Sequence, residues 1–375
     1  MGVIKLPKQT IDYIHVKNFR LYDDLKTTFN SGINIVVGDN AQGKTSLIEA
    51  IYTLCLTKSH KSSTDHNLIQ HQQDFAKIYA KGHHEDRAVS LELILSKDGK
   101  KARYNQIEFK RLSDYIGKMN AVMFAPEDLN LIKGSPSERR RFIDLELSQL
   151  DRHYVYYLNQ YRKQLKERNE HLKNLQKKKS TDLTLLSVLS EQLSQSAEKI
   201  VKKRQAFIEQ LAKTAKEIYF KLSNEDILKI YYEPSVDKDF LNALQARQQQ
   251  DIALGTTTVG PHRDDCGFYF AAMPVKNVAS QGQIRSVALA LKMAVVKLLN
   301  TYHDITPIIL LDDVFSELDN HRQQSILSML DKTAQIFITT TSLNHLNLKS
   351  LDSYQIIHVN AAKIEGVDTH ESPHL

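Results

Sequence analysis

The chain has few residues that could cross-link it or bind a structural metal. It contains two cysteines, Cys55 and Cys266, and neither belongs to a Cys-x-x-Cys pair or has the spacing of metal ligands. Disulfide bonds and structural zinc are therefore not expected, and both thiols should be buried packing residues. The sequence also lacks an apolar run approaching the roughly 18 residues of a membrane helix. Since residues 1–10 have no apolar secretion signal either, the sequence predicts a cytoplasmic protein without a membrane partner.

A second shortage is confined to the middle of the chain. No glycine or proline occurs between residues 137 and 221, and leucine recurs there at helical intervals. This pattern predicts two long helices joined by a turn near residues 179–182. A chain of 375 residues with 41% hydrophobic and 25% charged residues has ample material for a globular core on either side of this insertion.

Positive charge is dense in the predicted helices, although a net charge of +6 is by itself a weak indication of a polyanionic partner. The simplest interpretation is a solvated helical hairpin, and the alternative is an arm that lies along a polyanion. Arg139 and Arg140, just before the insertion, either contact the same partner or brace the neighbouring domain against the arm. The arm candidates for polyanion contact are Lys177, Lys178, Lys179, Lys202 and Lys203.

Strand and helix patterns alternate on both sides of the insertion, which predicts an α/β fold. Residues 33–37 are apolar except for Asn34, a run of the kind found in buried central strands, and a helical pattern follows at 46–56. Near the C-terminus, apolar runs at 308–311 and 336–340 flank a helical pattern at 320–330, a spacing typical of parallel sheets. The polar tail from residue 361 onward is expected to be loose.

A phosphate-binding motif follows the first of these apolar runs. The motif G-x-x-x-x-G-K-[ST] is matched in full by Gly38-Asp39-Asn40-Ala41-Gln42-Gly43-Lys44-Thr45, with Ser46 next in the helix. Glycines let the backbone wrap around phosphate with its N–H groups pointing inward, and the helix N-terminus favours the anion. Lys44 should reach the β and γ phosphates of a nucleoside triphosphate, and the Thr45 hydroxyl should bind Mg²⁺.

Two aspartates end the apolar run at 308–311, at the carboxyl end of a predicted parallel strand, where α/β sheets bind ligands. We expect Asp312 to hold Mg²⁺ and Asp313 to polarise the attacking water. Farther upstream, Ser280-Gln281-Gly282-Gln283 precedes a helical pattern and could be a simple helix cap. The order of phosphate loop, insertion, Ser-Gln-Gly-Gln and acidic strand is nevertheless that of ATP-binding cassette proteins. There, the serine–glycine helix start of one subunit covers the γ-phosphate bound by the other.

With these motifs in place, the chain resembles the RecF family of SMC-type ATPases over nearly its whole length. The resemblance also includes Lys17-Asn18-Phe19-Arg20, Ser59-His60-Lys61, Arg139-Arg140-Arg141-Phe142-Ile143-Asp144 and Gly260-Pro261-His262-Arg263-Asp264-Asp265. It implies a P-loop ATPase head of the cassette type with a short antiparallel helical arm. We accordingly divide the chain into residues 1–140 and 225–375, which form the head, and residues 141–224, which form the arm. Arg20 and Lys61 are added to the expected nucleotide contacts on this resemblance.

The family resemblance implies a function in recombinational DNA repair, including gap repair, replication fork maintenance and SOS induction. ATP would drive formation of a homodimer that clamps duplex DNA or single-strand/double-strand junctions without base specificity, and DNA would stimulate a weak ATPase that acts as a switch. RecO and RecR would be the partner proteins in loading recombinase. Two alternatives stay open: an ATPase subunit of a transporter, and a non-hydrolysing SMC-like clamp.

The sequence departs from the family pattern at several positions. Lys61 replaces an arginine, and lysine lacks the bidentate fork of that side chain. Ile284 and Ser286 stand where glutamine and threonine are usual, so contacts of the serine–glycine helix could differ. No glutamine occurs near residues 125–127, where the cassette family has one that positions water. Ala41 replaces a common glycine, which the motif tolerates.

Overall fold

The computed structural model describes residues 9–62, 64–318, 320–330, 333–348, 351 and 353–371. Contacts divide the chain into two compact units. The split unit combines Met1–Asp128 with Leu289–Leu375, and the inserted unit is Leu129–Ala288. Within the described ranges, every helix is too short or too polar to span a bilayer. The predicted division at residues 140 and 224 stays a prediction, because these units are defined by contacts alone.

The split unit contains a mixed sheet whose central strands are parallel. Its order is β15-β14-β3-β13-β12-β8. The strands are β3 (Ile33–Val37), β8 (Ala121–Phe124), β12 (Ile308–Asp312), β13 (Ile336–Thr340), β14 (Ser353–Asn360) and β15 (Lys363–Glu371). The continuous apolar runs of β12 and β13 are buried throughout, as expected for central strands. Since β13 alone separates β3 from β12, the carboxyl ends of both strands reach the same edge of the sheet.

A second, antiparallel sheet packs on the same core. Its order is β2-β1-β4-β5-β6-β7. The strands are β1 (Gln9–Phe19), β2 (Tyr22–Thr28), β4 (Phe75–His84), β5 (Arg87–Ser96), β6 (Gly99–Tyr104) and β7 (Ile107–Glu108). Burial alternates along β4 and β5, so one face of this sheet meets the core and the other is polar.

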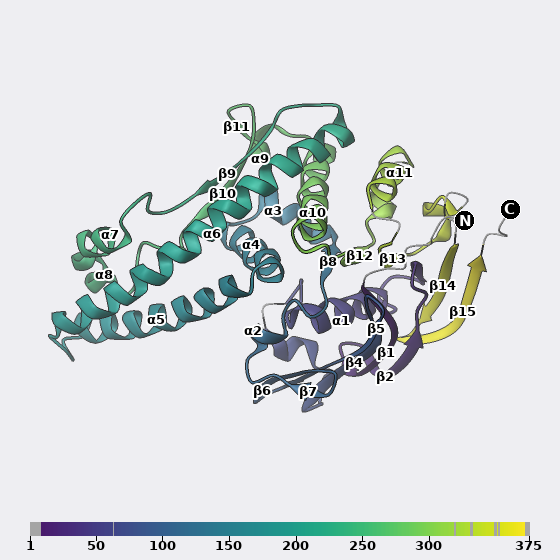
Figure 1. Ribbon diagram of the computed structural model, residues 1–375, viewed down its shortest axis with the longest axis horizontal. Helices are drawn as coiled ribbons and strands as arrows, with labels where there is room; N and C mark the ends of the chain where they lie inside the picture. The colour runs from purple at the N-terminus through teal and green to yellow at the C-terminus, as the bar shows by residue number, and fades with distance from the viewer. Residues whose placement is uncertain are drawn as a thin grey trace. The chain divides into compact units, whose positions relative to one another are not determined.

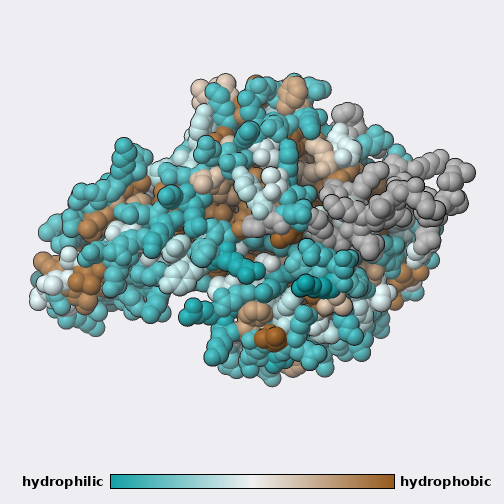
Figure 2. Space-filling view, in the orientation of Figure 1, coloured by the Kyte–Doolittle hydropathy of each residue, from teal (hydrophilic) through white to brown (hydrophobic). Residues whose placement is uncertain are grey.

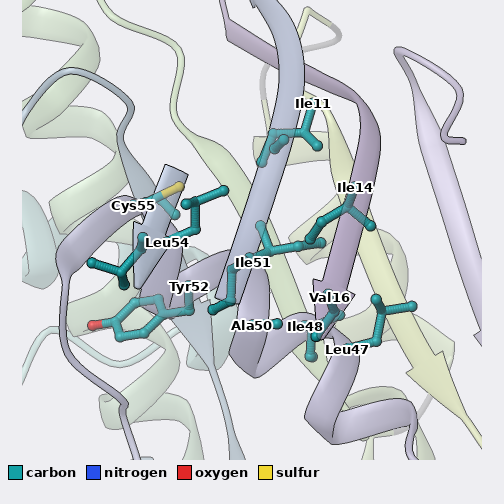
Figure 3. Packing of buried hydrophobic residues seen from close by; sticks show 14 of the residues in the cluster. Ile11, Ile14, Val16, Leu47, Ile48, Ala50, Ile51, Tyr52, Leu54 and Cys55 are labelled. Carbon is teal, nitrogen blue, oxygen red and sulfur yellow. The ribbon is translucent and has the colours of Figure 1, made fainter. Parts of the chain in front are cut away.

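Helix α1 (Lys44–Leu56) connects the two sheets through a shared hydrophobic core. Nearly all of its residues from Leu47 to Leu56 are buried, because it packs against strands of both sheets. Figure 3 shows side chains of β1 and α1 packed together, among them Ile11, Ile14, Val16, Leu47 and Ile51. Each such side chain contributes roughly 1.5–3 kcal/mol by leaving water. This packing fixes the first turn of α1, which carries the phosphate-binding motif.

The inserted unit is dominated by two long helices that lie side by side, α5 (Arg152–Gln176) and α6 (Leu183–Ser223) (Figure 1). Asp151 and Asp182 cap them by accepting hydrogen bonds from the first-turn N–H groups. The unit also contains α3 (Asn130–Lys133), α4 (Pro136–Leu150), β9 (Leu228–Glu233), α7 (Phe240–Ala246), α8 (Gln248–Leu254), β10 (Asp265–Phe270), β11 (Met273–Pro274) and α9 (Val275–Val278). The predicted pair of long helices and its connecting turn are thus confirmed.

The remaining elements complete the chain. They are η1 (Asp65–Leu68), α2 (Leu112–Tyr115), η2 (Pro126–Leu129), α10 (Gln281–His303), η3 (Phe315–Glu317), α11 (Asn320–Met329) and η4 (Leu343–His345). Both cysteines are free and buried, as predicted. The prediction of a loose tail was wrong for residues 363–371, which form β15 and pair with β14. This edge strand is mostly exposed and polar, so its sequence gives only a weak strand signal, and its pairing with β14 and the packing of Ile364 on the core define it.

Two arginines of the inserted unit are buried in ionic networks. Arg168 and Asp251 are both fully buried, and Arg168 Nη1 donates to Asp251 Oδ2 at 2.8 Å. Asp251 also accepts hydrogen bonds from Thr258. Arg204 donates to Asp144 Oδ1 at 2.8 Å and to the carbonyl oxygen of Pro261 at 2.7 Å. These bonds join α4, α5, α6, α8 and the segment before β10 into one unit.

We expect a large loss of stability when the buried ion pair between Arg168 on α5 and Asp251 on α8 is broken. Replacing Arg168→Met leaves the Asp251 carboxylate buried without its cation, which should lower the free energy of unfolding by about 3–5 kcal/mol. Urea denaturation followed by circular dichroism measures this loss. The matched control Lys163→Met changes an 80% exposed side chain on the same helix and should shift stability by less than about 0.5 kcal/mol. Equal effects of the two substitutions would show that the buried pair has no special role.

Candidate nucleotide-binding site

The phosphate-binding motif forms the turn between β3 and α1. Gly43 has a φ of 114° and Ala41 a φ of 62°, so the loop uses left-handed backbone conformations at two positions. At Gly38, a Cβ atom would lie only 2.1 Å from the carbonyl oxygen of Val359 on the neighbouring strand β14. Glycine is therefore required there by close backbone approach, and any other residue would move the loop away from the sheet.

Lys44 lies at the start of α1 and folds back over the loop. Its Nζ atom donates to the carbonyl oxygens of Gly38 at 2.7 Å and Asp39 at 2.6 Å. The side chain is 7% exposed, and burial lowers the pKa of its ammonium group. The nearby carboxylates of Asp313 and Asp312 oppose this shift in pKa. The loop thus holds a partly desolvated cation where a bound triphosphate would need one.

The loop and the acidic strand meet through hydroxyl groups. Thr45 Oγ1 and Thr339 Oγ1 each donate to Asp312 Oδ1 at 2.8 Å. Asp312 is 2% exposed, and burial raises the pKa of its carboxyl group despite these two hydrogen bonds. A hydroxyl and a carboxylate at the mouth of a phosphate loop are oxygen ligands of the kind that Mg²⁺ takes together with nucleotide phosphates. The residues present therefore fit this ion.

Asp313, the next residue, has an unusual environment. Its φ of 51° lies in the left-handed region, and its N–H donates to Thr339 Oγ1 at 2.9 Å. Its Oδ1 atom is buried and has no hydrogen-bond partner among the described residues. One carboxylate oxygen of Asp313 is therefore buried beside the phosphate loop's acidic strand without a donor from the described residues.

Lys61 bridges two acidic side chains beside the same site. Its Nζ atom lies 3.1 Å from Glu127 Oε1 and 3.6 Å from Asp312 Oδ2. Glu127 begins the segment after β8, in the region where the expected glutamine is missing. The structure therefore puts a lysine–glutamate pair next to the candidate metal ligand.

Arg20 is paired with an acidic residue of α1. Its Nε and Nη2 atoms donate to the two carboxylate oxygens of Glu49 at 2.9 and 2.8 Å, and Nη1 donates to the carbonyl oxygen of Asn67. A cavity of about 470 Å³ opens beside this pair. Its lining is Arg20, Leu21, Thr45, Ser46, Glu49, Lys61, Asn67, Ile69, Gln70 and His71. Four of these lining residues could not be predicted from the sequence, because they lie in or just after the 3₁₀ turn η1 and match no motif: Asn67, Ile69, Gln70 and His71.

The serine–glycine motif belongs to the inserted unit. Ser280 Oγ accepts a hydrogen bond from the N–H of Gln283 at 3.2 Å, and Gln283 Oε1 accepts one from the N–H of Ser280 at 2.9 Å. This reciprocal pair is a capping box at the start of α10. Ser280 is exposed, whereas Ile284 and Ser286 are buried. The two departures from the family pattern therefore lie inside the fold and not on the exposed start of the helix.

The candidate DNA-contacting residues divide into exposed and inward-facing groups. Lys177, Lys178 and Lys179 lie in the exposed turn between α5 and α6, and Lys202 is exposed on α6. Lys203 is half-buried and forms an ion pair with Asp151. Figure 2 shows mainly hydrophilic atoms over the visible face of the α5–α6 hairpin.

Arg139 and Arg140 bind residues within the inserted unit. Arg139 is 8% exposed and donates to both carboxylate oxygens of Asp265 at 2.7 and 2.9 Å. Arg140 donates to the carbonyl oxygen of Asp264 at 2.7 Å. These bonds favour bracing over DNA contact for both arginines. The bracing differs from the expected one, since it joins α4 to the start of β10 inside one unit.

Comparison with known proteins gives consistent matches over almost the whole chain. The family model described as the RecF/RecN/SMC N terminal domain matches residues 10–364. A DNA replication and repair protein RecF from Bacillus cereus (strain AH820) is 43% identical over 367 residues, which cover 95% of this chain and 98% of that protein.

Solved structures show the same pattern. A structure of the recombination mediator protein RecF with ATP, from the RecFOR pathway, is 30% identical with a TM-score of 0.89, and covers 99% of this chain and all of that one. The Smc head bound to the C-winged helix domain of ScpA is 16% identical with a TM-score of 0.54, over 96% of this chain and 97% of that one. The second similarity shows the fold alone.

The site geometry predicts that nucleotide affinity depends on one ammonium group. Lys44→Ala should weaken ATP binding on the order of 100-fold, because a charged donor in a partly desolvated loop contributes most strongly to phosphate affinity. Isothermal titration with ATP and Mg²⁺ measures the change. The control Lys101→Ala, on an exposed position of β6, should bind ATP as the unaltered protein does. Retained affinity in the Lys44 variant would contradict the assignment of the loop.

Proposed function

The chain belongs to the RecF family of the RecF/RecN/SMC group, and from this we propose that it is an ATP-dependent DNA-binding protein of recombinational DNA repair. The observation that supports this most directly is the hydrogen bond between Thr45 and Asp312, which joins the phosphate loop to the acidic strand. It brings motifs 267 residues apart in the sequence into one ATP site. Gap repair, replication fork maintenance and SOS induction follow from membership of this family.

ATP and Mg²⁺ are the proposed ligands of the split unit. The loop amides from Gly38 to Gly43 and the Lys44 ammonium would bind the phosphates, and Thr45 with Asp312 would hold the ion. Bound Mg²⁺ supplies charge neutralisation between the β and γ phosphates. The cavity beside Arg20 and Lys61 has room for the nucleoside part, although Arg20 acts there mainly by fixing Glu49.

Hydrolysis is proposed to depend on Asp313. Its unpartnered Oδ1 atom would orient a water molecule for attack on the γ-phosphate and accept its proton. Glu127 stands where cassette ATPases have a glutamine, and its bond to Lys61 would hold it beside the metal site. We propose a weak ATPase that DNA stimulates and that acts as a switch. A single-turnover assay separates this from the non-hydrolysing clamp.

Dimerisation is proposed to complete the site. Ser280 and Gly282 lie at the exposed N-terminal end of α10, where free N–H groups favour an anion. Their position in the order of cassette motifs supports contact with the γ-phosphate bound by a second copy of the chain. ATP would then join two copies, and its hydrolysis would release them.

DNA is the proposed polyanion, held without base specificity as duplex or as a single-strand/double-strand junction. The exposed lysines of the α5–α6 turn and Lys202 would contact phosphates, and the inward-facing Arg139 and Arg140 would not. RecO- and RecR-type proteins are proposed as partners, since a similar solved structure is that of a RecF protein of the RecFOR pathway. The same role implies a cytoplasmic location. A transporter subunit is disfavoured, because the relatives are named as DNA repair proteins.

The dimer proposal predicts opposite effects for two substitutions. Asp313→Asn should slow turnover by roughly 10²- to 10⁴-fold, the usual contribution of a general base. ATP should therefore accumulate between two copies and give a stable dimer. Adding Ser280→Arg should leave ATP bound but abolish that dimer, because a large cation replaces the small residue that covers the γ-phosphate. Light scattering after size-exclusion chromatography with ATP and Mg²⁺ measures both.

The control for this experiment is Lys276→Arg, an exposed and conservative change nearby on α9, which should dimerise normally. A normal ATP-dependent dimer in the Ser280→Arg protein would remove the motif from the interface. Unchanged turnover in the Asp313→Asn protein would remove that aspartate from catalysis.

The arm proposal predicts a salt-dependent loss of DNA affinity. Reversing the charge at Lys177, Lys178 and Lys179 to glutamate should weaken duplex binding by roughly 10- to 100-fold at low salt and flatten its dependence on salt concentration. Fluorescence anisotropy across a salt series measures both quantities. The matched control reverses the same amount of charge at Lys97, Lys101 and Lys110, which are exposed on β6 and in the segments that follow β5 and β7. If both triple variants lose affinity equally, the effect comes from net charge and not from the arm.

A further inference from the structure

A tight turn near the C-terminus contacts the phosphate-binding loop directly. Ala361 and Ala362 connect β14 to β15, and both belong to the split unit. The N–H of Ala361 donates to Gln42 Oε1 at 2.5 Å, and the N–H of Ala362 donates to the carbonyl oxygen of Gln42 at 2.9 Å. Both turn amides therefore bind one residue of the loop, which lies about 320 positions earlier in the sequence.

The backbone of this turn is unfavourable for the residues that form it. Ala361 has a φ of 46° and Ala362 a φ of 56°, between the paired residues Asn360 and Lys363. Two-residue hairpin turns with two positive φ values strongly prefer Asn-Gly or Gly-Gly, because a Cβ atom is crowded in this conformation. Unfavourable backbone conformations persist where surrounding contacts hold them, and they cluster at functional sites. Here the turn is held by its two hydrogen bonds to Gln42 and by packing of Ala362 against the hydrophobic core.

The loop needs hydrogen-bond donors from outside itself. When loop amides point inward toward a phosphate, the carbonyl groups point outward and must find other partners. The Gln42 carbonyl accepts a hydrogen bond from the N–H of Ala362. The Gly43 carbonyl accepts one from the N–H of Leu47 in α1 at 3.0 Å and one from the buried Tyr22 hydroxyl at 3.1 Å. A Cβ atom on Gly43 would also lie 3.5 Å from Ala362 Cα. The turn thus packs against the loop where it enters α1.

We propose that the Ala361–Ala362 turn is a positioning element for ATP binding, which holds Gln42 so that the loop amides stay directed at the phosphates. This rests on the proposed nucleotide-binding function of the loop. Because coupling between two sites is reciprocal, bound ATP should in turn stabilise the turn. The C-terminal hairpin would then report on the nucleotide state of the site.

The test is a series of substitutions at Ala361, whose side chain is exposed. Ala361→Gly keeps the N–H group and accepts positive φ, so its ATP affinity should equal or exceed that of the unaltered protein. Ala361→Val keeps the N–H group but disfavours positive φ, and Ala361→Pro removes the donor and forbids positive φ. The proline variant should bind ATP roughly tenfold more weakly, with valine in between. In turnover assays KM should rise in the same order while kcat changes by less than about twofold.

Amide hydrogen exchange gives a second measurement on the unaltered protein. ATP with Mg²⁺ should slow exchange at Ala361 and Ala362 by at least roughly fivefold. The exposed turn between β6 and β7, formed by Asn105 and Gln106, also has two positive φ values and serves as the internal reference. Its amide exchange rates should not change when ATP binds. This measurement applies even if the proline variant does not fold.

The two proposals fail in different ways. If Lys44→Ala abolishes ATP binding while folded Ala361 variants all bind ATP equally, the turn is only structural and this inference is wrong. If ATP does not slow amide hydrogen exchange at Ala361 and Ala362, this inference is also wrong. If Lys44→Ala binds ATP as the unaltered protein does, the phosphate-loop function itself is wrong. Melting temperatures that fall in the valine and proline variants without a change in affinity also overturn the inference.

Discussion

The buried carboxylate of Asp312 is the point on which the site depends. It accepts hydrogen bonds from Thr45 at the start of α1 and from Thr339 at the end of β13, so three elements converge on one oxygen atom. Burial disfavours its charge, and the surrounding hydroxyls and Lys61 compensate only in part. A divalent cation at this position would complete the compensation. Asp312 Oδ1 therefore links elements of the split unit by hydrogen bonds and also belongs to the proposed nucleotide site.

The sequence was sufficient to predict the central strands and the phosphate loop, because both have strong local signals. Short runs of apolar residues, four in β12 and three in β13, identify these strands, and the eight-residue motif fixes the position of Lys44 and Thr45. The long helices were equally clear from their leucine spacing and from the lack of glycine and proline. Other features depend on distant partners: β15 is polar, and its existence follows from pairing with β14. Asn67, Ile69, Gln70 and His71 line the cavity together with residues of α1, although no local motif marks them.

Sequence alone also could not separate arginines that face solvent from those that do not. Arg139 and the exposed Lys177 look alike as positive charges near a basic arm, but Arg139 is paired with Asp265 in a partly buried network. Arg168 and Arg204 are likewise basic residues in the arm whose charges are used internally. The result is an inserted unit braced by buried ion pairs, with its remaining positive charge concentrated on exposed lysines. The number of basic residues alone would therefore overestimate how many side chains of this unit can contact DNA phosphates.

The strand order of the split unit determines when its site can form during synthesis. Strand β3, which precedes the phosphate loop, pairs with β13 and β14, and both of these are made about 300 residues later. Until residues 336–340 have left the ribosome, β3 has neither neighbour, and its second edge stays unpaired until β14 follows. Such non-local pairing folds slowly and exposes unpaired strands to aggregation. A nascent chain would therefore gain ATP affinity only after β13 and β14 have been made and have paired with β3.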